Sequence, residues 1–143
     1  MKTHITILAA AMLFIAACTP SPKTHSDSPR TQNAELTDEE AVKIRVEKRW
    51  EALLARDMAA AYEFETPAYR AVNDIASYRS KYFNQIKWLG ITVRDIARAK
   101  DLPDTMNVGV ILDFESQGGH PGYTRVDEVW VKRDGLWWHV SKR

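Results

Sequence analysis

The hydrophobic and polar positions of this chain follow three different patterns from its N-terminus to its C-terminus. A continuous apolar run extends from Ile5 to Phe14. Between residues 38 and 82, apolar residues recur every three or four positions, which indicates amphipathic helices. From Leu89 onward they alternate with polar residues, which indicates half-buried strands. The chain is therefore expected to place its helices before its strands.

The first helix has the clearest start. Thr37 followed by Glu40 fits a capping box, in which a hydroxyl and a carboxylate each bind a backbone amide. The helix is expected over residues 38–56. One face carries the apolar residues Val42, Val46, Trp50, Leu53 and Leu54.

Two shorter helices are expected after it. Asp57 can cap a second helix that contains Tyr62, and Pro67 is expected to end it. Asp74 can cap a third helix, with Tyr78 and Tyr82 on one side.

Four strands are expected in the second half. The first runs around Leu89–Val93, the second around Met106–Phe114, the third over Tyr123–Lys132 and the fourth over Leu136–Ser141. The Asp134-Gly135 pair is a strong signal for a hairpin with a two-residue turn. Because helices and strands do not interleave, the predicted fold class is α+β, with three N-terminal helices packed on a curved antiparallel sheet of about four strands.

The hairpin register also suggests which side chains face the core. A two-residue turn pairs Val131 with Trp138 and Trp130 with His139. We predict that one face covers the helices, with Val129, Val131, Leu136, Trp138 and Val140. The same parity places Arg125 and Asp127 on the core side, whereas Trp130, Trp137 and His139 fall on the outward face. A bulged turn would invert one strand relative to the other.

The charge balance bears on the possible partners of the chain, and the cysteine content on the covalent links within it. The chain has 20 Lys and Arg against 19 Asp and Glu. Removal of residues 1–17 takes away Lys2 and no acidic residue, which leaves 19 against 19. This balance gives no electrostatic argument for a nucleic-acid partner. Cys18 is the only cysteine, so no disulfide can form within the chain.

The N-terminal run resembles a bacterial lipoprotein signal. Lys2 supplies a positive segment, Ile5–Phe14 an apolar segment, and Ile15-Ala16-Ala17-Cys18 is similar to a lipobox. The resemblance implies lipidation of Cys18, cleavage before it, and an address in the cell envelope. Because residue 19 is Thr and not Asp, it implies the inner leaflet of the outer membrane, facing the periplasm. A membrane-spanning helix is the disfavoured alternative, since it needs about 20 apolar residues and Pro20 follows closely.

These patterns divide the chain into three parts. Residues 1–17 are interpreted as the signal peptide. Residues 18–36, rich in Ser, Thr and Pro, are interpreted as the lipidated cysteine and a flexible tether. Residues 37–143 are interpreted as one small domain.

The domain resembles the nuclear transport factor 2-like family. Residues 46–69, VEKRWEALLARDMAAAYEFETPAY, are similar to the family's first two helices with a short Arg-Asp break. Residues 126–140, VDEVWVKRDGLWWHV, resemble its closing hairpin. The resemblance implies a cone-shaped fold with a pocket between helices and sheet. It leaves the function open, because the family includes ketosteroid isomerase and polyketide cyclases beside many domains without catalysis.

Three functional interpretations stay open at this point. The preferred one is a lipid-anchored, non-catalytic binding domain that pairs with itself or with an envelope protein through the outer sheet face, with Trp130, Trp137 and His139 as interface candidates. The second is a binder of a small apolar ligand in the cone. Its pocket candidates are Trp50, Tyr62, Tyr78, Tyr82, Arg125 and Asp127.

The third interpretation is an isomerase-like or cyclase-like enzyme. Asp127 would act as general base in an apolar cone, and one of the tyrosines would donate to an oxyanion. The simpler reading pairs Asp127 with Arg125 or Lys142. The four histidines have no ligand-like spacing, so neither a metal nor a cofactor is predicted.

Overall fold

The computed structural model describes residues 36–82 and 86–141. Four helices precede four strands in this part of the chain. The helices are α1 (Asp38–Leu54), α2 (Met58–Tyr62), α3 (Pro67–Val72) and α4 (Ile75–Lys81). The strands are β1 (Lys87–Arg98), β2 (Thr105–Glu115), β3 (Pro121–Arg133) and β4 (Leu136–His139). The signal, the lipobox and most of the tether lie outside the described residues.

The helix starts follow the capping residues of the sequence. Thr37 and Glu40 form the expected capping box at the start of α1. Asp57 caps α2 and Asp74 caps α4. The second helix ends at Tyr62, before Pro67, so the proline does not end it as predicted. Pro67 instead begins α3, a helix that was not predicted. Thr66 caps this helix, and the proline occupies its first turn, where a missing N–H costs no hydrogen bond.

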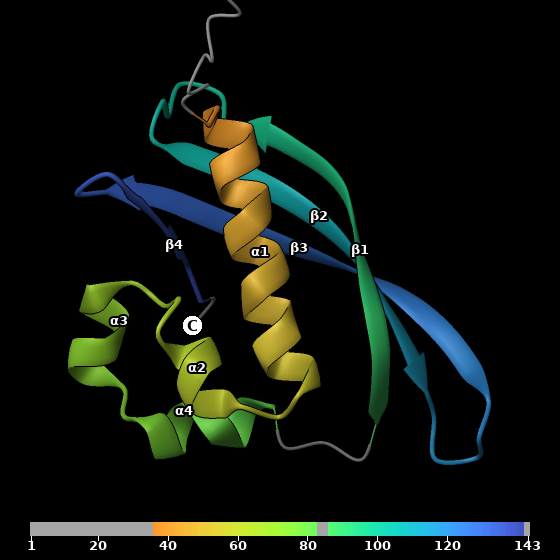
Figure 1. Ribbon diagram of the computed structural model, residues 1–143. Coiled ribbons are helices and arrows are strands. Elements are labelled where there is room, and N and C mark those ends of the chain that lie inside the picture. The colour runs from red at the N-terminus through yellow and green to blue at the C-terminus, as the bar shows by residue number, and fades with distance from the viewer. Residues whose placement is uncertain (1–35, 83–85, 142–143) are drawn as a thin grey trace, which may run out of the picture. The chain divides into compact units, whose positions relative to one another are not determined.

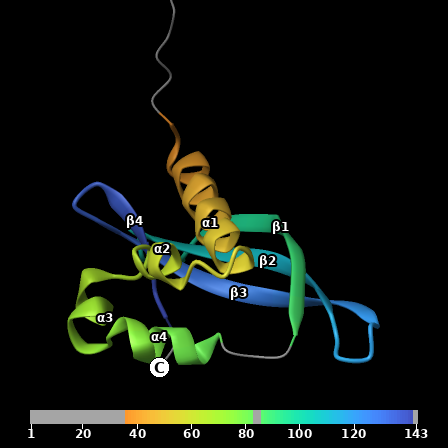
Figure 2. The same cartoon turned by 60° about the horizontal axis from the view of Figure 1, so that its bottom comes forward.

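The four strands form one antiparallel sheet in the order β1-β2-β3-β4. Helix α1 lies against one face of the curved sheet, and α2, α3 and α4 continue from its end toward β4 (Figures 1 and 2). The segment after α2 runs beside the free edge of β4, where Glu65 and His139 form a parallel bridge. The predicted α+β fold class is therefore confirmed, with one additional short helix.

The core lies between α1 and the face of the sheet that we call the inner face. Alternate residues of β2 cover it, together with Trp130 of β3 and Trp137 of β4. The buried hydrophobic residues there include Met106, Val108, Val110, Leu112, Trp130 and Trp137, which meet Val42, Val46, Trp50 and Leu53 of α1.

The face assignment made from the hairpin was wrong, although its register was right. Arg133 does pair with Leu136, and Trp130 with His139. However, Trp130, Trp137 and His139 are buried on the inner face, whereas Leu136 is exposed. The physical reason is twofold. A tryptophan buries more apolar surface than a valine, and the polar atoms of Trp130 and His139 find buried partners, described below.

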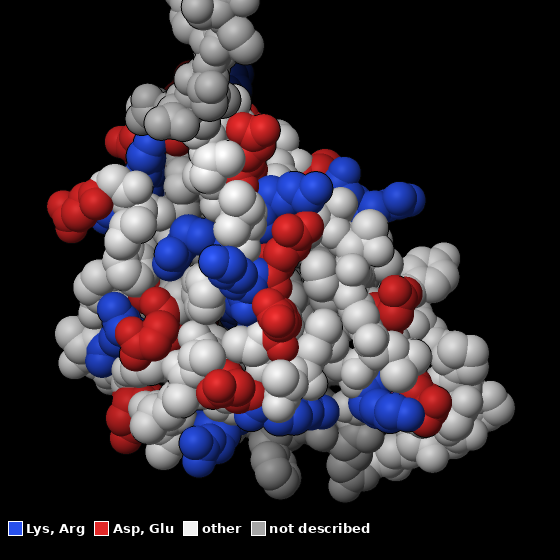
Figure 3. All heavy atoms as spheres, viewed as in Figure 1, with Lys and Arg blue, Asp and Glu red and all other residues white. Residues whose placement is uncertain are grey.

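The residues described by the structure include no helix long and apolar enough to cross a membrane. On the face seen in Figure 3, Lys and Arg are interspersed with Asp and Glu, and neither sign forms a continuous field.

The β3–β4 turn gives a test of the fold. Asp134 and Gly135 both have positive φ, at 51° and 76°, as a two-residue hairpin turn with the sheet's twist requires. We predict that Gly135→Ala lowers the free energy of unfolding by about 1 kcal/mol, because a Cβ disfavours this backbone conformation. Urea unfolding measures the effect. Gly90→Ala in β1 is the control, since an added Cβ there meets nothing within 4 Å. If both variants lost the same unfolding free energy, the result would contradict the positive-φ conformation of Gly135.

Candidate functional site: a buried ion cluster beside a pocket

Arg49 of α1 is the centre of a group of charged side chains in the core. It is 2% exposed. Its Nη1 donates to Oε1 of Glu128 at 2.9 Å, and its Nη2 lies 2.6 Å from the Tyr82 hydroxyl and 3.4 Å from Oε1 of Glu65. We call Arg49, Glu65, Tyr82, Glu128 and His139 the ion cluster. Its members come from α1, the segment after α2, the end of α4, β3 and β4.

Glu128 has donors on both of its carboxylate oxygens. Besides Arg49, the indole nitrogen of Trp50 donates to Oε1 at 2.9 Å, and that of Trp130 donates to Oε2 at 2.9 Å. A carboxylate with three such donors is well solvated inside the protein.

Glu65 and His139 form the second part of the cluster. Nδ1 of His139 lies 2.8 Å and 3.0 Å from the two oxygens of Glu65, so it donates to this carboxylate. Burial alone would raise the pKa of Glu65. The hydrogen bond from His139 and the positive charges of His139 and Arg49 outweigh burial and hold this pKa below 4.5.

The same environment fixes the charge states of Arg49 and Tyr82. Burial by itself would lower the pKa of Arg49, but Glu128, and after it Tyr82, Tyr78 and Glu65, raise it above its usual value. Burial raises the pKa of Tyr82, although the charge of Arg49 opposes this. Arg49 is thus a permanent cation and Tyr82 a neutral phenol.

A pocket of about 470 Å³ opens beside the ion cluster. Tyr82, Glu128 and His139 form part of its wall, with Lys81 from α4 and Ser141 after β4. The side chains behind this wall close the rest of the space between helices and sheet: Trp50 and Tyr78 are buried, and Tyr78 packs between Tyr62 and Tyr82. The pocket is therefore shallow and polar.

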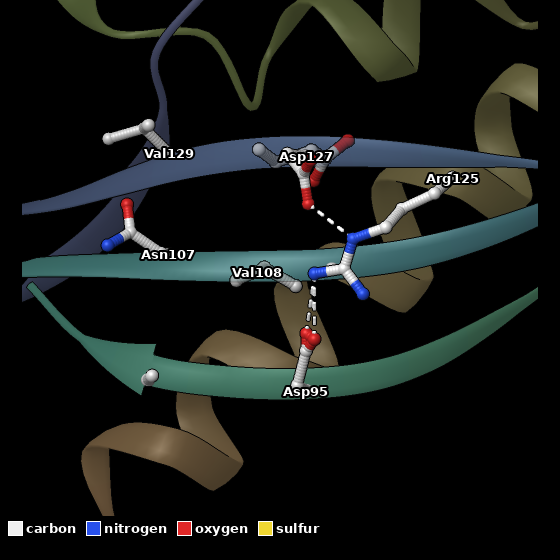
Figure 4. Close-up of a pocket in the computed structure, with 9 residues that line it drawn as sticks. Asp95, Asn107, Val108, Arg125, Asp127 and Val129 are labelled. Carbon is white, nitrogen blue, oxygen red and sulfur yellow. Dashed lines mark hydrogen bonds and ion pairs between the residues drawn. The ribbon is translucent and has the colours of Figure 1, made fainter.

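Asp127 and Arg125 lie elsewhere than predicted. Both are on the outer face, the side of the sheet away from α1, as Figure 4 shows. The Arg125 guanidinium lies between Asp95 of β1 and Asp127, at 2.8 Å and 2.7 Å. Side chains of Asp127 and Arg125 are 65% and 50% exposed. The prediction that Asp127 lies inside an apolar cone was wrong, because β3 presents Glu128 and Trp130 to the core and the alternation then turns Asp127 outward.

Gly109 makes this outer ion bridge possible. It is paired with Asp95 on one side and Asp127 on the other, in the middle of the sheet. A Cβ at this position would lie 2.3 Å from the Arg125 guanidinium. A glycine in a central strand often marks such a close approach. The bridge borders a hollow of about 380 Å³ on the outer face.

The structure thus separates the sequence candidates into two groups. Trp50, Tyr82 and His139 come together at the ion cluster, with Tyr62 and Tyr78 packed behind. Arg125 and Asp127 form their ion bridge on the opposite face, although both also border the pocket beside the ion cluster. Sequence reasoning missed Arg49, Glu65 and Glu128 as a group. Arg49 stands three residues after Val46 on the apolar face of α1, and Glu128 lies on the same side of β3 as Trp130. A charged residue at a position in line with core residues was the signal by which the sequence could have identified them.

No three His, Cys, Asp or Glu side chains gather around a common point that could hold a metal ion within residues 36–82 and 86–141.

Comparison with known proteins adds information on the fold alone. No protein-family model matches the chain, and no curated protein matches it in sequence. A SEC-C motif containing protein from Psychrobacter arcticus is similar in structure, with a TM-score of 0.58 and 14% identity over 76% of this chain and 63% of that one. The chain thus spans less than two thirds of this neighbour.

Two further neighbours complete the comparison. A SEC-C motif containing protein from Rhodopseudomonas palustris has a TM-score of 0.53 and 19% identity, over 65% of this chain and 70% of that one. A ketosteroid isomerase-like protein from Erwinia carotovora atroseptica has a TM-score of 0.49 and 13% identity, over 72% of this chain and 92% of that one. The last likeness is too low to carry an argument about this chain.

Acid should weaken the ion cluster through Glu65. Its pKa is lower in the folded than in the unfolded chain, so it contributes stability above pH 4.5 that is lost as the pH falls through the folded value. We predict that Glu65→Gln lowers the free energy of unfolding by about 3 kcal/mol at pH 7, and that this difference shrinks below pH 4.5. Urea unfolding across pH measures it. Glu63→Gln, at a side chain 66% exposed, is the matched control; a difference independent of pH would contradict the charge assignment.

Proposed function

We propose that this chain is an envelope lipoprotein, anchored through lipid on Cys18, whose α+β domain is a non-catalytic binding domain of the nuclear transport factor 2-like class. The observation that carries the binding role is the saturation of its buried acids. Glu128 and Glu65 are each held by charged or indole donors. Neither has the free, weakly solvated carboxylate that a general base needs.

The outer face supports the same interpretation. It carries the aromatic residue Tyr123, which is 76% exposed. Hollows of about 380 Å³ and 360 Å³ lie on it. Exposed apolar side chains beside hollows and mixed charges are typical of surfaces that bind other proteins.

A second copy of the chain is the occupant that this face fits best. Arg94 and Arg125 stand beside Asp95, Asp113 and Asp127 on the same surface. A two-fold interface brings the same patch of each subunit together, so a patch with both signs can pair each cation with an anion of the other copy. The projecting Tyr123 can enter the hollow over Gly109 and Ala97. We therefore propose a homodimer formed through the outer face.

The two other interpretations from the sequence lose support. The residues expected to line an apolar cone, Trp50 and Tyr78, are themselves buried packing. Asp127 is exposed and bonded to Arg125 on the outer face, so it does not lie in the apolar cone that the enzyme interpretation requires.

Oligomeric state tests the proposed interface. We predict that the full chain in mild detergent sediments as a dimer, and that Tyr123→Ser combined with Ala97→Glu makes it monomeric, because the projection is lost and the hollow gains a charge. Leu136→Ser, at an exposed residue of the β3–β4 turn, should keep the dimer. A monomeric parent chain would overturn the homodimer, and an envelope protein lost only in the double variant would identify a different occupant.

The lipid anchor has its own test. We predict that Cys18→Ser leaves an uncleaved precursor that lacks the mass of the acyl chains, because the thiol is the only group to which the diacylglyceryl unit can be attached in the lipobox resemblance. Intact-mass spectrometry of the membrane fraction measures this. Normal cleavage and unchanged mass in the variant would refute the anchor.

A further inference from the structure

A second cavity lies on the other side of the chain segment that follows β4. It has a volume of about 580 Å³, within the range of small-molecule sites, about 300–1,000 Å³. We call it the α3–α4 cavity. It is formed by α3, α4 and the residues after β4, and its wall includes Ala68, Tyr69, Val72, Lys81, Val140 and Ser141.

Among the described residues that line this cavity, Lys81 is the only charged one. Its Nζ lies 4.9 Å from the centre of the Tyr69 ring, which also lines the cavity, so the ammonium group is held at the wall by a cation–π contact. Lys81 forms no ion pair with any residue in the described part of the chain. An unpaired cation beside a cavity favours an anionic group of a ligand.

The neighbouring pocket beside the ion cluster shares Lys81, Val140 and Ser141, but it has a different charge balance. The described wall of that pocket holds both signs of charge, since Lys81 and Arg125 stand beside Asp127 and Glu128. The described wall of the α3–α4 cavity holds the charge of Lys81 and no carboxylate. The α3–α4 cavity is therefore the better place for a ligand whose anion binds Lys81.

The remaining wall is suited to hydrocarbon. Val72 of α3 is 81% exposed, the highest exposure among the large hydrophobic residues in the described part of the chain. Ala68 and Val140 add further apolar surface. The exposed area of Val72 would leave water when an apolar chain covers it, which stabilises the bound state.

We propose that the α3–α4 cavity binds a small amphipathic monocarboxylate. The carboxylate accepts a charge-assisted hydrogen bond from Lys81, and the hydrocarbon part lies on Val72, Ala68 and the Tyr69 ring. This site is separate from the outer face, so its existence does not depend on the proposed homodimer.

Octanoate is a suitable probe, because it combines one carboxylate with a short hydrocarbon chain. The experiment uses the full chain in lipid nanodiscs and [1-¹³C]octanoate followed by ¹³C NMR, with empty nanodiscs to subtract partition into lipid. We expect saturable binding to the protein. Lys81→Gln should weaken it about tenfold or more, as removal of a charge-assisted hydrogen bond does, and Lys81→Arg should restore most of it.

Matched variants and ligands separate charge from apolar contact. Lys100→Gln, at another exposed lysine, should leave octanoate binding unchanged. 1-Octanol should bind equally to the parent chain and to Lys81→Gln, since it has no charge for Lys81 to bind. Val72→Glu, at a side chain that is not part of the core, should abolish octanoate binding. Absence of saturable binding, or equal affinity in Lys81→Gln and the parent chain, would overturn the site while leaving the dimer proposal intact.

Discussion

A positive charge in the core of a small domain needs negatively charged or hydrogen-bonding partners in direct contact with it. Arg49 carries such a charge, and the need for its partners constrains how the helices and the sheet are arranged. Its partners come from segments far apart in the sequence, since Glu65 follows α2, Tyr82 ends α4 and Glu128 lies in β3. His139 then connects Glu65 to β4. The cluster therefore joins α1, the segment between α2 and α3, and the end of α4 to β3 and β4. Loss of one partner leaves a buried charge without compensation, which costs about 3–5 kcal/mol.

The cluster also decides which surfaces are available for function. Its acids are occupied by donors, and its aromatic neighbours fill the space where a deep pocket would otherwise lie. The surfaces that we propose for binding therefore lie at the periphery of the domain. The outer face carries hollows around an exposed ion bridge, and Lys81 stands at the wall of the α3–α4 cavity without an ion pair to any described residue.

Local signals in the sequence predicted the elements well, because they act over a few residues. The capping box at Thr37, the Asp57 and Asp74 caps and the Asp134-Gly135 turn are all present. The inward and outward faces of β3 and β4 could not be assigned in this way. The number of aliphatic residues favoured the face with Val129 and Val131 as the inner one. The face that is actually buried depends on partners that are remote in sequence. Glu128 faces inward because Arg49 and Trp50 lie there, and His139 faces inward because Glu65 lies there. The candidate site was therefore found only in part, with Tyr82 and His139 named but their charged partners missed.

The coupling between Arg49 and Glu128 tests the central claim most directly. A double-mutant cycle of Arg49→Met, Glu128→Gln and the combined variant, followed by urea unfolding at pH 7, isolates their interaction from the separate effects of each substitution. The account predicts a coupling free energy of about 2 kcal/mol or more, with the double variant less destabilised than the sum of the single ones. A coupling near zero would contradict it, because the two charges would then not depend on each other in the folded core.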